Sequence, residues 1–482
     1  MIPILSTLLL LTLLAVLFSF WGKRKFAADI ALLGTFIVLL LALGGLIQFD
    51  YSASGFQMVE EYNWIPQMDV QVIFGIDGWS YPMIVLTALL FFIGVLISRN
   101  SIKENQQYYY PIFLLLEFSV LGVFMSLDLF LFYIFWEIVL IFMFFLILLW
   151  GHENRKYASM KFLIYTHVGS LVMLLAIIAL YFQAGAHSFD IRVLAEASYP
   201  IAFQYLIFGG MLFAFMIKMP IVPFHTWLPD AHVEAPTAGS IVLAGVMLKM
   251  GAYGLLRIPM TILPDAAKDL AIWMAVLGFI TIVYGAFVSL AQTNLKRMIA
   301  YSSVNHMGVV LLGLATLTPI GINGANFEMF SHGLVAALLF ALAGAIYERL
   351  HTYEISTMGG LASVVPKLTW IFVIASLASM GLPGLSGFVA EFSVFVGSFQ
   401  AFGAWTFLAL LGVVVTAAYF LLTLQRGFFG AIPTMLPKMK DFAGAEMYPY
   451  TILAVFIFVF GIFPALLLSM LNPTTMAFIS AL

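Results

Sequence analysis

The sequence predicts an all-α protein that crosses a lipid bilayer about fourteen times. Of its 482 residues, 63% are apolar and only 9% are charged, whereas a soluble globular protein carries about 25% charged residues. Apolar runs repeat along the whole chain with no polar domain between them. This composition excludes a soluble globular protein, which could not cover so much apolar surface, and a disordered chain, which is poor in apolar residues. The net charge of −3 and the lack of a basic block also exclude a nucleic-acid-binding protein.

We assign a span where about 20 consecutive residues are apolar, because that length crosses the hydrocarbon core. The predicted spans are 2–22, 27–48, 79–98, 110–127, 129–150, 160–183, 201–228, 237–257, 267–290, 299–318, 323–347, 367–400, 404–429 and 447–471. The first span has the length of a signal peptide, but it lacks preceding positive residues and a small-residue cleavage site. We therefore expect it to be a retained helix.

The positions of Lys and Arg predict the orientation of these spans. With the N-terminus outside, the cytoplasmic loops hold fifteen cations, namely Lys23, Arg24, Lys25, Arg99, Lys103, Arg155, Lys156, Lys161, Lys296, Arg297, Arg349, Lys367, Arg426, Lys438 and Lys440. The outer loops hold three, Arg192, Arg257 and Lys268. This asymmetry follows the positive-inside rule and predicts that both termini lie outside. The acidic outer loop 49–78 is expected to form a short hairpin over 63–78.

Two spans are predicted to contain broken helices. Pro220 and Pro223 interrupt span 201–228, and a glycine-rich segment around Pro383 interrupts span 367–400, because proline removes a backbone donor and clashes with the preceding turn. The breaks lie five spans apart, and an odd offset reverses orientation. Spans 4–8 and 9–13 are therefore predicted to form two inverted five-helix repeats, each with one broken helix, as in inverted-repeat transporters. The expected units are an N-terminal three-helix segment over 1–109, a first repeat over 110–257, a second repeat over 258–430 and a C-terminal helix within 431–482.

Charged residues inside the spans are the main functional candidates. They are Glu137, Lys218, Lys249 and Glu391. Each charge costs about 2.5–3.5 kcal/mol at the bilayer centre on insertion scales, so intramembrane charges usually mark a functional path. The structural alternative is an ion pair between Glu137 and Lys218 that fixes helix packing. Glu117 also lies inside a span, and the sequence favours equally a role in a proton path and a role as a structural partner of another residue.

Histidines extend this pattern. His225, His306 and His332 lie in or beside spans and could relay protons, because imidazole binds and releases a proton near neutral pH. The alternative for each is a hydrogen-bonded core histidine, and that alternative is favoured for His167. A bis-histidine haem site is disfavoured, since it needs histidines that face each other at matched depths. The absence of cysteine excludes disulfides, thiolate-bound iron–sulfur clusters and cysteine-bound zinc.

Four motifs resemble the antiporter-like membrane subunits of respiratory complex I. They are KMPIVPFHTWLPDAH at 218–232 with EAPTAGS at 234–240, LKMGAYGLLR at 248–257, DLFLFYIFWE at 128–137, and LKRMIAYSSVNHMG at 295–308. The resemblance covers essentially the whole chain. Glu391, where the sister N and L chains typically carry lysine, and the lack of a long lateral helix after the last span make the chain most similar to the M type.

The resemblance implies a proton-translocating subunit of an NADH-quinone oxidoreductase without its own redox centre or metal. It implies that Glu137 is an acid paired with Lys218, which would hold a proton at the first broken helix. It implies that Lys249 is the central relay and that the proton leaves outward from Glu391. FMN, iron–sulfur clusters and quinone are expected in other subunits. The neighbouring L and N chains and the lipid bilayer are the expected partners, in the inner or plasma membrane of a bacterium or archaeon.

Other functions fit some features of the same pattern. A subunit of a multi-subunit Na⁺/H⁺ antiporter, or of a related ferredoxin or F420H2 dehydrogenase, would share this fold. The run PTAGS at 236–240 and Glu391 favour the complex I type over the antiporter. A redox subunit with its own cofactor is a further alternative. A purely structural scaffold is the last, and the intramembrane charges argue against it.

Overall fold

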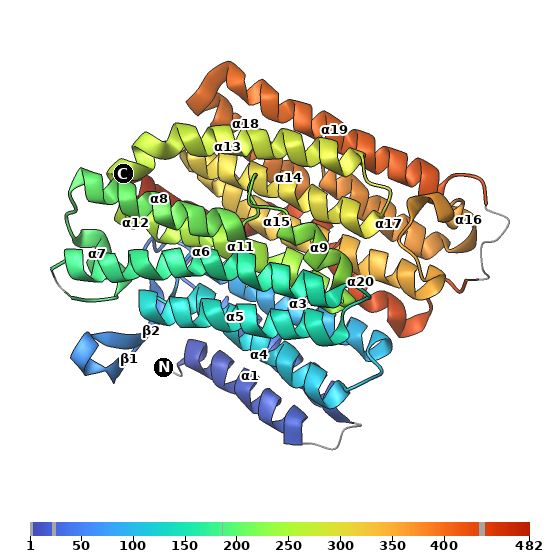
Figure 1. Ribbon diagram of the computed structural model, residues 1–482, viewed down its shortest axis with the longest axis horizontal. Helices are drawn as coiled ribbons and strands as arrows, with labels where there is room; N and C mark the ends of the chain where they lie inside the picture. The colour runs from blue at the N-terminus through green and yellow to red at the C-terminus, as the bar shows by residue number, and fades with distance from the viewer. Residues whose placement is uncertain (1–2, 22–25, 186, 433–438) are drawn as a thin grey trace.

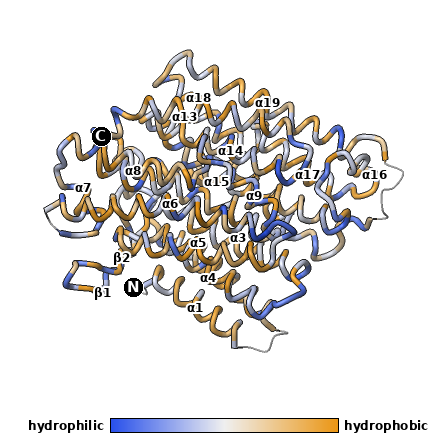
Figure 2. The backbone as a smooth tube through the Cα atoms, viewed as in Figure 1, coloured by the Kyte–Doolittle hydropathy of each residue, from blue (hydrophilic) through white to orange (hydrophobic). Residues whose placement is uncertain are grey.

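Long apolar helices dominate the fold, because only a helix satisfies its own backbone polar groups inside a bilayer. The computed structural model of the chain describes residues 3–21, 26–185, 187–432 and 439–482. Its long helices run between two opposite ends of one bundle (Figure 1). Hydrophobic residues follow the helices, and hydrophilic residues gather in the loops at the two ends (Figure 2).

The elements follow one another in three groups. The first group contains α1 (Ile4–Trp21), α2 (Ala27–Gly45), β1 (Gln57–Ile65), η2 (Pro66–Met68), β2 (Val70–Ile76) and α3 (Ser80–Ser101). The second contains α4 (Gln106–Met125), α5 (Leu129–Trp150), α6 (Arg155–Gln183), α7 (Ile191–Glu196), α8 (Ile201–Lys218), α9 (Trp227–Glu234), α10 (Thr237–Val242), the π-helical turn η3 (Leu243–Met247), α11 (Leu248–Arg257) and α12 (Pro259–Ile262). The third contains α13 (Pro264–Leu290), α14 (Leu295–Ala315), α15 (Pro319–Leu350), η4 (Ile355–Thr357), α16 (Leu361–Val364), α17 (Pro366–Ser379), α18 (Ser386–Phe402), η5 (Gly403–Thr406), α19 (Phe407–Thr423), the π-helical turn η6 (Leu424–Phe428), η7 (Gly444–Met447), α20 (Tyr448–Ile462) and α21 (Ala465–Ala481).

The predicted all-α membrane fold is confirmed. Among the described residues, 13 helical segments are long and apolar enough to cross a membrane. One of them, Ser386–Phe428, has 43 residues and contains both α18 and α19, which makes fourteen crossings. The last predicted span, 447–471, is wrong in its bounds, because α20 ends at Ile462 and Pro464 starts a second helix, α21. The hairpin β1–β2 begins earlier than predicted, at Gln57.

The chain ends and the loops are distributed between the two ends of the bundle. The N- and C-termini lie toward one end, together with the β1–β2 hairpin and α7, whereas α16 lies at the other end (Figure 1). Arg192 lies on α7 and Arg257 in the last turn of α11, where it is buried rather than in a loop as predicted. Lys23, Arg24, Lys25 and Lys438 are outside the described residues.

Hydrogen bonds at the two ends repeat the same pattern. Before α5, the Leu129 N–H donates to the Phe189 carbonyl at 2.9 Å, and the Ile191 N–H donates to that of Leu127 at 2.9 Å. Before α14, the Leu295 N–H donates to the Tyr353 carbonyl at 2.8 Å, and the Ile355 N–H donates to that of Thr293 at 2.9 Å. The first set lies beside α7 and the second beside α16, at opposite ends of the bundle (Figure 1). This arrangement is the one that two inverted repeats produce.

Two spans are surrounded by protein on all sides. Every residue is buried in the most apolar 18-residue stretch of Thr237–Ile262 and in that of α15. Glycines allow close helix packing around them, as is common in membrane bundles; a Cβ at Gly324 on α15 would lie 2.7 Å from the Val394 nitrogen on α18. By contrast, Leu175 on α6 and Val414 on α19 are 68% and 67% exposed. The α10–α11 and α15 helices are therefore the interior in which polar side chains are shielded from lipid.

Candidate functional site

The first helix break carries a buried lysine. α8 ends at Lys218 because Pro220 follows, with a positive φ of 20°. Lys218 is 1% exposed, and its Nζ has no hydrogen-bond partner among the described residues. The nitrogen lies 5.3 Å from the centre of the Trp136 ring and 5.8 Å from that of Phe162. Pro223 lies in the exposed portion of the break.

Glu137 contacts a histidine instead of the expected lysine. Its Oε2 lies 3.1 Å from His167 Nδ1 on α6, and the two side chains are 20% and 48% exposed. Within the described portions of the chain, no ion pair joins Glu137 to Lys218, so the expected direct pair is not formed. The aromatic rings of Trp136 and Phe162 lie beside the ammonium instead. Glu137 nevertheless lies within electrostatic reach of Lys218.

A second buried lysine, Lys249, lies in the middle of the bundle. This residue is 0% exposed and follows the π-helical turn η3, whose wide turn leaves carbonyls free. Its Nζ donates to the Ala244 carbonyl in that turn and lies 2.7 Å from His332 Nδ1 on α15. α11 packs against the first break, because a Cβ at Gly251 would lie 2.8 Å from the Met219 nitrogen. Lys249 is thus placed between the first break and α15.

Three buried side chains meet beyond His332. The His306 ring on α14 lies 5.1 Å from the His332 ring. His306 Nδ1 is 3.1 Å from Glu328 Oε1 on α15 and 3.3 Å from Glu391 Oε1 on α18. We call His306, Glu328 and Glu391 the terminal cluster. The other ring nitrogen, His306 Nε2, lies 3.1 Å from Ser379 Oγ at the end of α17.

The second helix break positions the terminal cluster. α17 ends at Ser379, and Gly381 adopts a φ of 70°. The Leu382 N–H donates to the Leu377 carbonyl at 3.0 Å, and the Ile221 N–H in the first break donates to that of Met216 at 2.9 Å. The two breaks therefore have the same local hydrogen bonding. Pro383 lies in the exposed portion of the second break, and α18, which carries Glu391, starts at Ser386.

The remaining candidates are buried without hydrogen bonds. Both Glu117 oxygens on α4 lack a partner, and the residue is 0% exposed. Both nitrogens of His225 are also unpartnered, with the ring 5.0 Å from that of Tyr284. His232 on α9 is 0% exposed and stacks on Phe340, with the ring centres 4.2 Å apart. Neither Glu117 nor His225 contacts the Lys249–terminal cluster series directly.

Sequence reasoning missed Glu328. The residue lies inside the predicted span 323–347, four positions before His332, so the rule that selects intramembrane charges applies to it as well. It also did not predict the contact of His167 with Glu137, because a helix with apolar residues on every side gives no indication of which neighbour a polar group faces.

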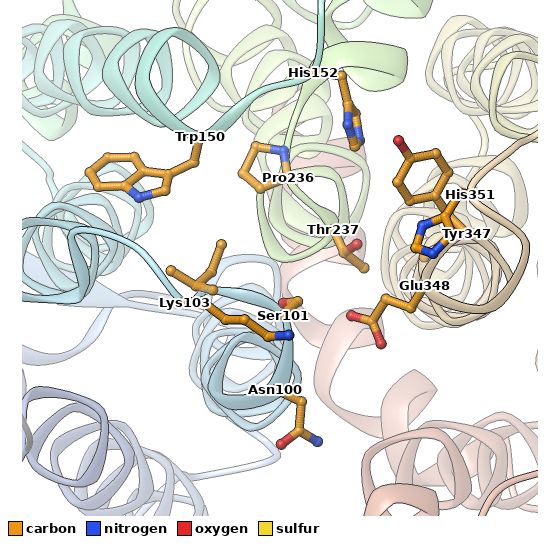
Figure 3. Close-up of a pocket in the computed structure, with 12 residues that line it drawn as sticks. Asn100, Ser101, Lys103, Trp150, His152, Pro236, Thr237, Tyr347, Glu348 and His351 are labelled. Atoms are coloured by element: carbon orange, nitrogen blue, oxygen red, sulfur yellow. The ribbon is translucent and has the colours of Figure 1, made fainter. Parts of the chain in front are cut away.

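A pocket of about 400 Å³ opens at the end of the bundle opposite the termini. Lys103 and Glu348 lie across it from each other, and His152, Tyr347 and Thr237 line it (Figure 3). Burial, together with the nearby charge of Lys296, lowers the pKa of His152, in the loop before α6, to about 4. Thr237 is the first residue of α10, so the pocket reaches the start of the span that carries Lys249.

Comparisons with known proteins give one consistent result. Residues 126–418 match the family described as NADH:quinone oxidoreductase/Mrp antiporter, transmembrane. The chain is 41% identical to F(420)H(2) dehydrogenase subunit M of Methanosarcina mazei, over 100% of this chain and 99% of that protein. It is 39% identical to NADH-quinone oxidoreductase subunit M of Rickettsia bellii, over 98% and 97%. A chain of the respiratory complex I structure from Thermus thermophilus superposes with a TM-score of 0.92 at 31% identity, over 99% of both chains.

Proposed function

This chain belongs to the family of NADH:quinone oxidoreductase and Mrp antiporter transmembrane subunits, and from that premise we propose that it translocates protons as a non-redox subunit of a respiratory complex of the NADH-quinone oxidoreductase type. The observation that carries the proposal is the unbroken series of buried titratable groups from Lys249 through His332 and His306 to Glu391. Lys249 Nζ lies 2.7 Å from His332 Nδ1, the ring centres of His332 and His306 are 5.1 Å apart, and His306 Nδ1 lies 3.3 Å from Glu391 Oε1. Such groups inside a membrane are costly, and they mark ion or proton routes.

The first break supplies the proton in this proposal. Lys218 is buried, which favours its neutral form, and the negative charge of Glu137 favours its protonated form. When Glu137 is neutralised or moves with His167, Lys218 loses this attraction and releases its proton. Water that enters at the broken backbone carries the proton toward Lys249, since unwound backbone at membrane depth is tolerated beside a hydrated cavity.

The second break delivers the proton outward. His332 receives it from Lys249, passes it to His306, and Glu391 releases it beside the unwound segment at Gly381. The pocket at Thr237 opens on the side from which the protons come. His225 and Glu117 serve as hydrated side branches of the route rather than as links in the series.

The proposal includes partners and a location. FMN, iron–sulfur clusters and quinone belong to other subunits, and this chain acts as a translocase. Neighbouring L and N chains cover some of its apolar surface, and lipid covers the rest. The chain lies in the plasma or inner membrane of a bacterium or archaeon with both termini outside. The electron donor differs between the two named relatives, F420H2 in one and NADH in the other, so the proposal concerns the proton route that they share.

The test uses the intact complex in proteoliposomes, with electron transfer and proton uptake recorded together. We expect Lys218→Ala and Lys249→Ala to slow proton transfer through this subunit by roughly 10²-fold or more, which is the contribution of a positioned acid–base group. The control is Lys268→Ala, because Lys268 is an exposed residue on α13. Normal assembly with undiminished pumping in both buried-lysine variants would contradict the proposal.

A further inference from the structure

The terminal cluster contains one ionisable group that the proposed route does not use. The donor and acceptor atoms of His306, Glu328 and Glu391 all lie within 4.8 Å of one another. Their side chains are 5%, 2% and 8% exposed. The three residues come from three different helices, α14, α15 and α18, so the packing of the whole second repeat brings them together.

The surroundings of Glu328 leave it little role as a packing residue. It lies in the first third of α15, where neighbouring positions are buried, and an apolar side chain would fill that place without a desolvation cost. The charged or titratable groups that act on it are His306, Glu391 and Lys249. Each of these groups belongs to the proposed proton route; Glu328 lies beside His306 and Glu391 and acts on Lys249 through space.

Charge balance determines what such a cluster does. Two carboxylates that share one buried site cannot both remain ionised without compensation. A proton on His306 compensates one negative charge, and the remaining proton is held by the group as a whole rather than by one residue. His306 Nδ1, which lies between the two carboxyl groups, makes no hydrogen bond of good geometry to either, so neither carboxyl group is fixed as its sole partner.

We propose that Glu328 is a third proton-carrying residue of the terminal cluster and shares a proton with His306 and Glu391. This inference rests on the proposed function. A proton leaves His306 Nδ1 as its N–H bond breaks, and an O–H bond forms on Glu328. The O–H bond of Glu328 then breaks as His306 is protonated again, and the second transfer places the proton on Glu391. In this way Glu328 stores the incoming proton while Glu391 discharges the previous one.

The experiment compares variants of Glu328 in the intact complex in proteoliposomes. Glu328→Gln keeps the size of the side chain and removes its proton, and we expect at least a tenfold loss of pumped protons per electron pair at unchanged assembly. Glu328→Asp keeps the carboxyl group and should retain most of the pumping. Glu196→Gln, at the exposed end of α7, is the matched control.

Infrared difference spectra recorded during turnover give a readout that a purely structural role would not change. A protonated carboxyl band that shifts in heavy water should disappear in Glu328→Gln and shift in Glu328→Asp. If Glu328→Gln fails to assemble, the Asp variant decides, since a carboxyl band that does not shift there would overturn the inference. Full pumping and an intact carboxyl band in Glu328→Gln, with pumping lost in Glu391→Gln, would refute this inference alone. Full pumping in Glu328→Gln, Glu391→Gln and Lys249→Ala together would refute the proposed function.

Discussion

At the residue scale, the environment of Lys218 explains how one side chain can be both stable and ready to change its charge. Its Nζ is enclosed by the Trp136 and Phe162 rings, which attract a cation weakly without binding its protons. Glu137 acts on Lys218 through space and itself contacts His167. Removing the charge of Glu137 therefore shifts the equilibrium between protonated and neutral Lys218 without breaking any hydrogen bond of the lysine.

Asp128 combines a structural and a titrating role at the start of α5. Its carboxylate accepts hydrogen bonds from the Leu131 N–H at 2.9 Å and the Gln71 N–H at 3.1 Å, so it caps α5 and holds strand β2. Burial raises its pKa to about 6, although these hydrogen bonds lower it. We expect Asp128→Ala to lose about 1 kcal/mol of stability, as for other N-caps, whereas Asp128→Asn keeps the cap.

The raised pKa also predicts a pH dependence. Between the ordinary value near 4 and the folded value near 6, the folded state binds more protons than the unfolded state, so stability falls as pH rises through that window and is level above it. Thermal unfolding in detergent at pH 4 to 7 measures this slope. Asp128→Asn should reduce the change of stability with pH, because Asp128 no longer titrates. An identical dependence of stability on pH in the variant and the parent would contradict a raised pKa of Asp128.

At the scale of the elements, the second break depends on glycine geometry. Gly381 has a φ of 70°, and a Cβ there would lie 2.8 Å from Glu391 Oε2. Gly381→Ala should therefore cost about 1–2 kcal/mol of backbone strain and also displace the Glu391 carboxylate. We expect lower proton pumping together with a lower unfolding temperature, measured on the same preparation.

Gly384 provides the control for this prediction. It lies in the same break with a φ of 93°, but a Cβ there would meet nothing within 4 Å. Gly384→Ala should thus lower stability by a similar amount and leave pumping intact. Equal losses of pumping in both variants would show that backbone strain, rather than the contact with Glu391, is responsible.

Sequence could predict the elements better than their contacts. The breaks at Pro220 and near Pro383 follow from local stereochemistry, and their equal spacing in the two halves follows from the span count. The partner of Glu137 cannot be predicted in this way, because α5 is apolar on every side and hydropathy does not determine the rotation of the helix about its own axis. The same limit applies to Lys249, since the π-helical turn before it changes the face that the following residues present.

At the scale of the whole molecule, a buried ion pair joins the hairpin region to the first repeat. Arg257 at the end of α11 donates to Asp77 before α3, and the two side chains are 5% and 2% exposed. Asp77 also accepts from the Trp79 and Ser80 N–H groups at 3.0 Å. Asp77→Asn or Arg257→Gln should each cost about 3–5 kcal/mol, because one charge is left buried without its partner.

A double-mutant cycle measures this coupling. The combined variant should lose less stability than the sum of the single variants, since neither charge is then unpaired. The surface pair Arg99–Asp29, with side chains 42% and 52% exposed, serves as the comparison, and breaking it should cost less than about 1 kcal/mol. Additive effects at Asp77 and Arg257 would argue against a coupled pair.

The terminal cluster shows where sequence reasoning ends at this scale. Glu391 and His306 can be selected from their spans, and Glu328 satisfies the same rule. The sequence cannot predict that these three residues contact one another, because that depends on how α14, α15 and α18 pack around the break at Gly381. Only the assembled bundle turns three isolated charges into one site.

The wide turn at Leu243–Met247 has a consequence for the register of the central span. An α-helix advances about 100° per residue, so the extra residue accommodated in this turn offsets the phase of everything that follows. α10 can therefore face α3 while α11 faces α8, although both belong to one crossing. Deleting a single residue from this turn would leave the loops at both ends unaltered and yet swing Lys249 by about a quarter-revolution away from His332.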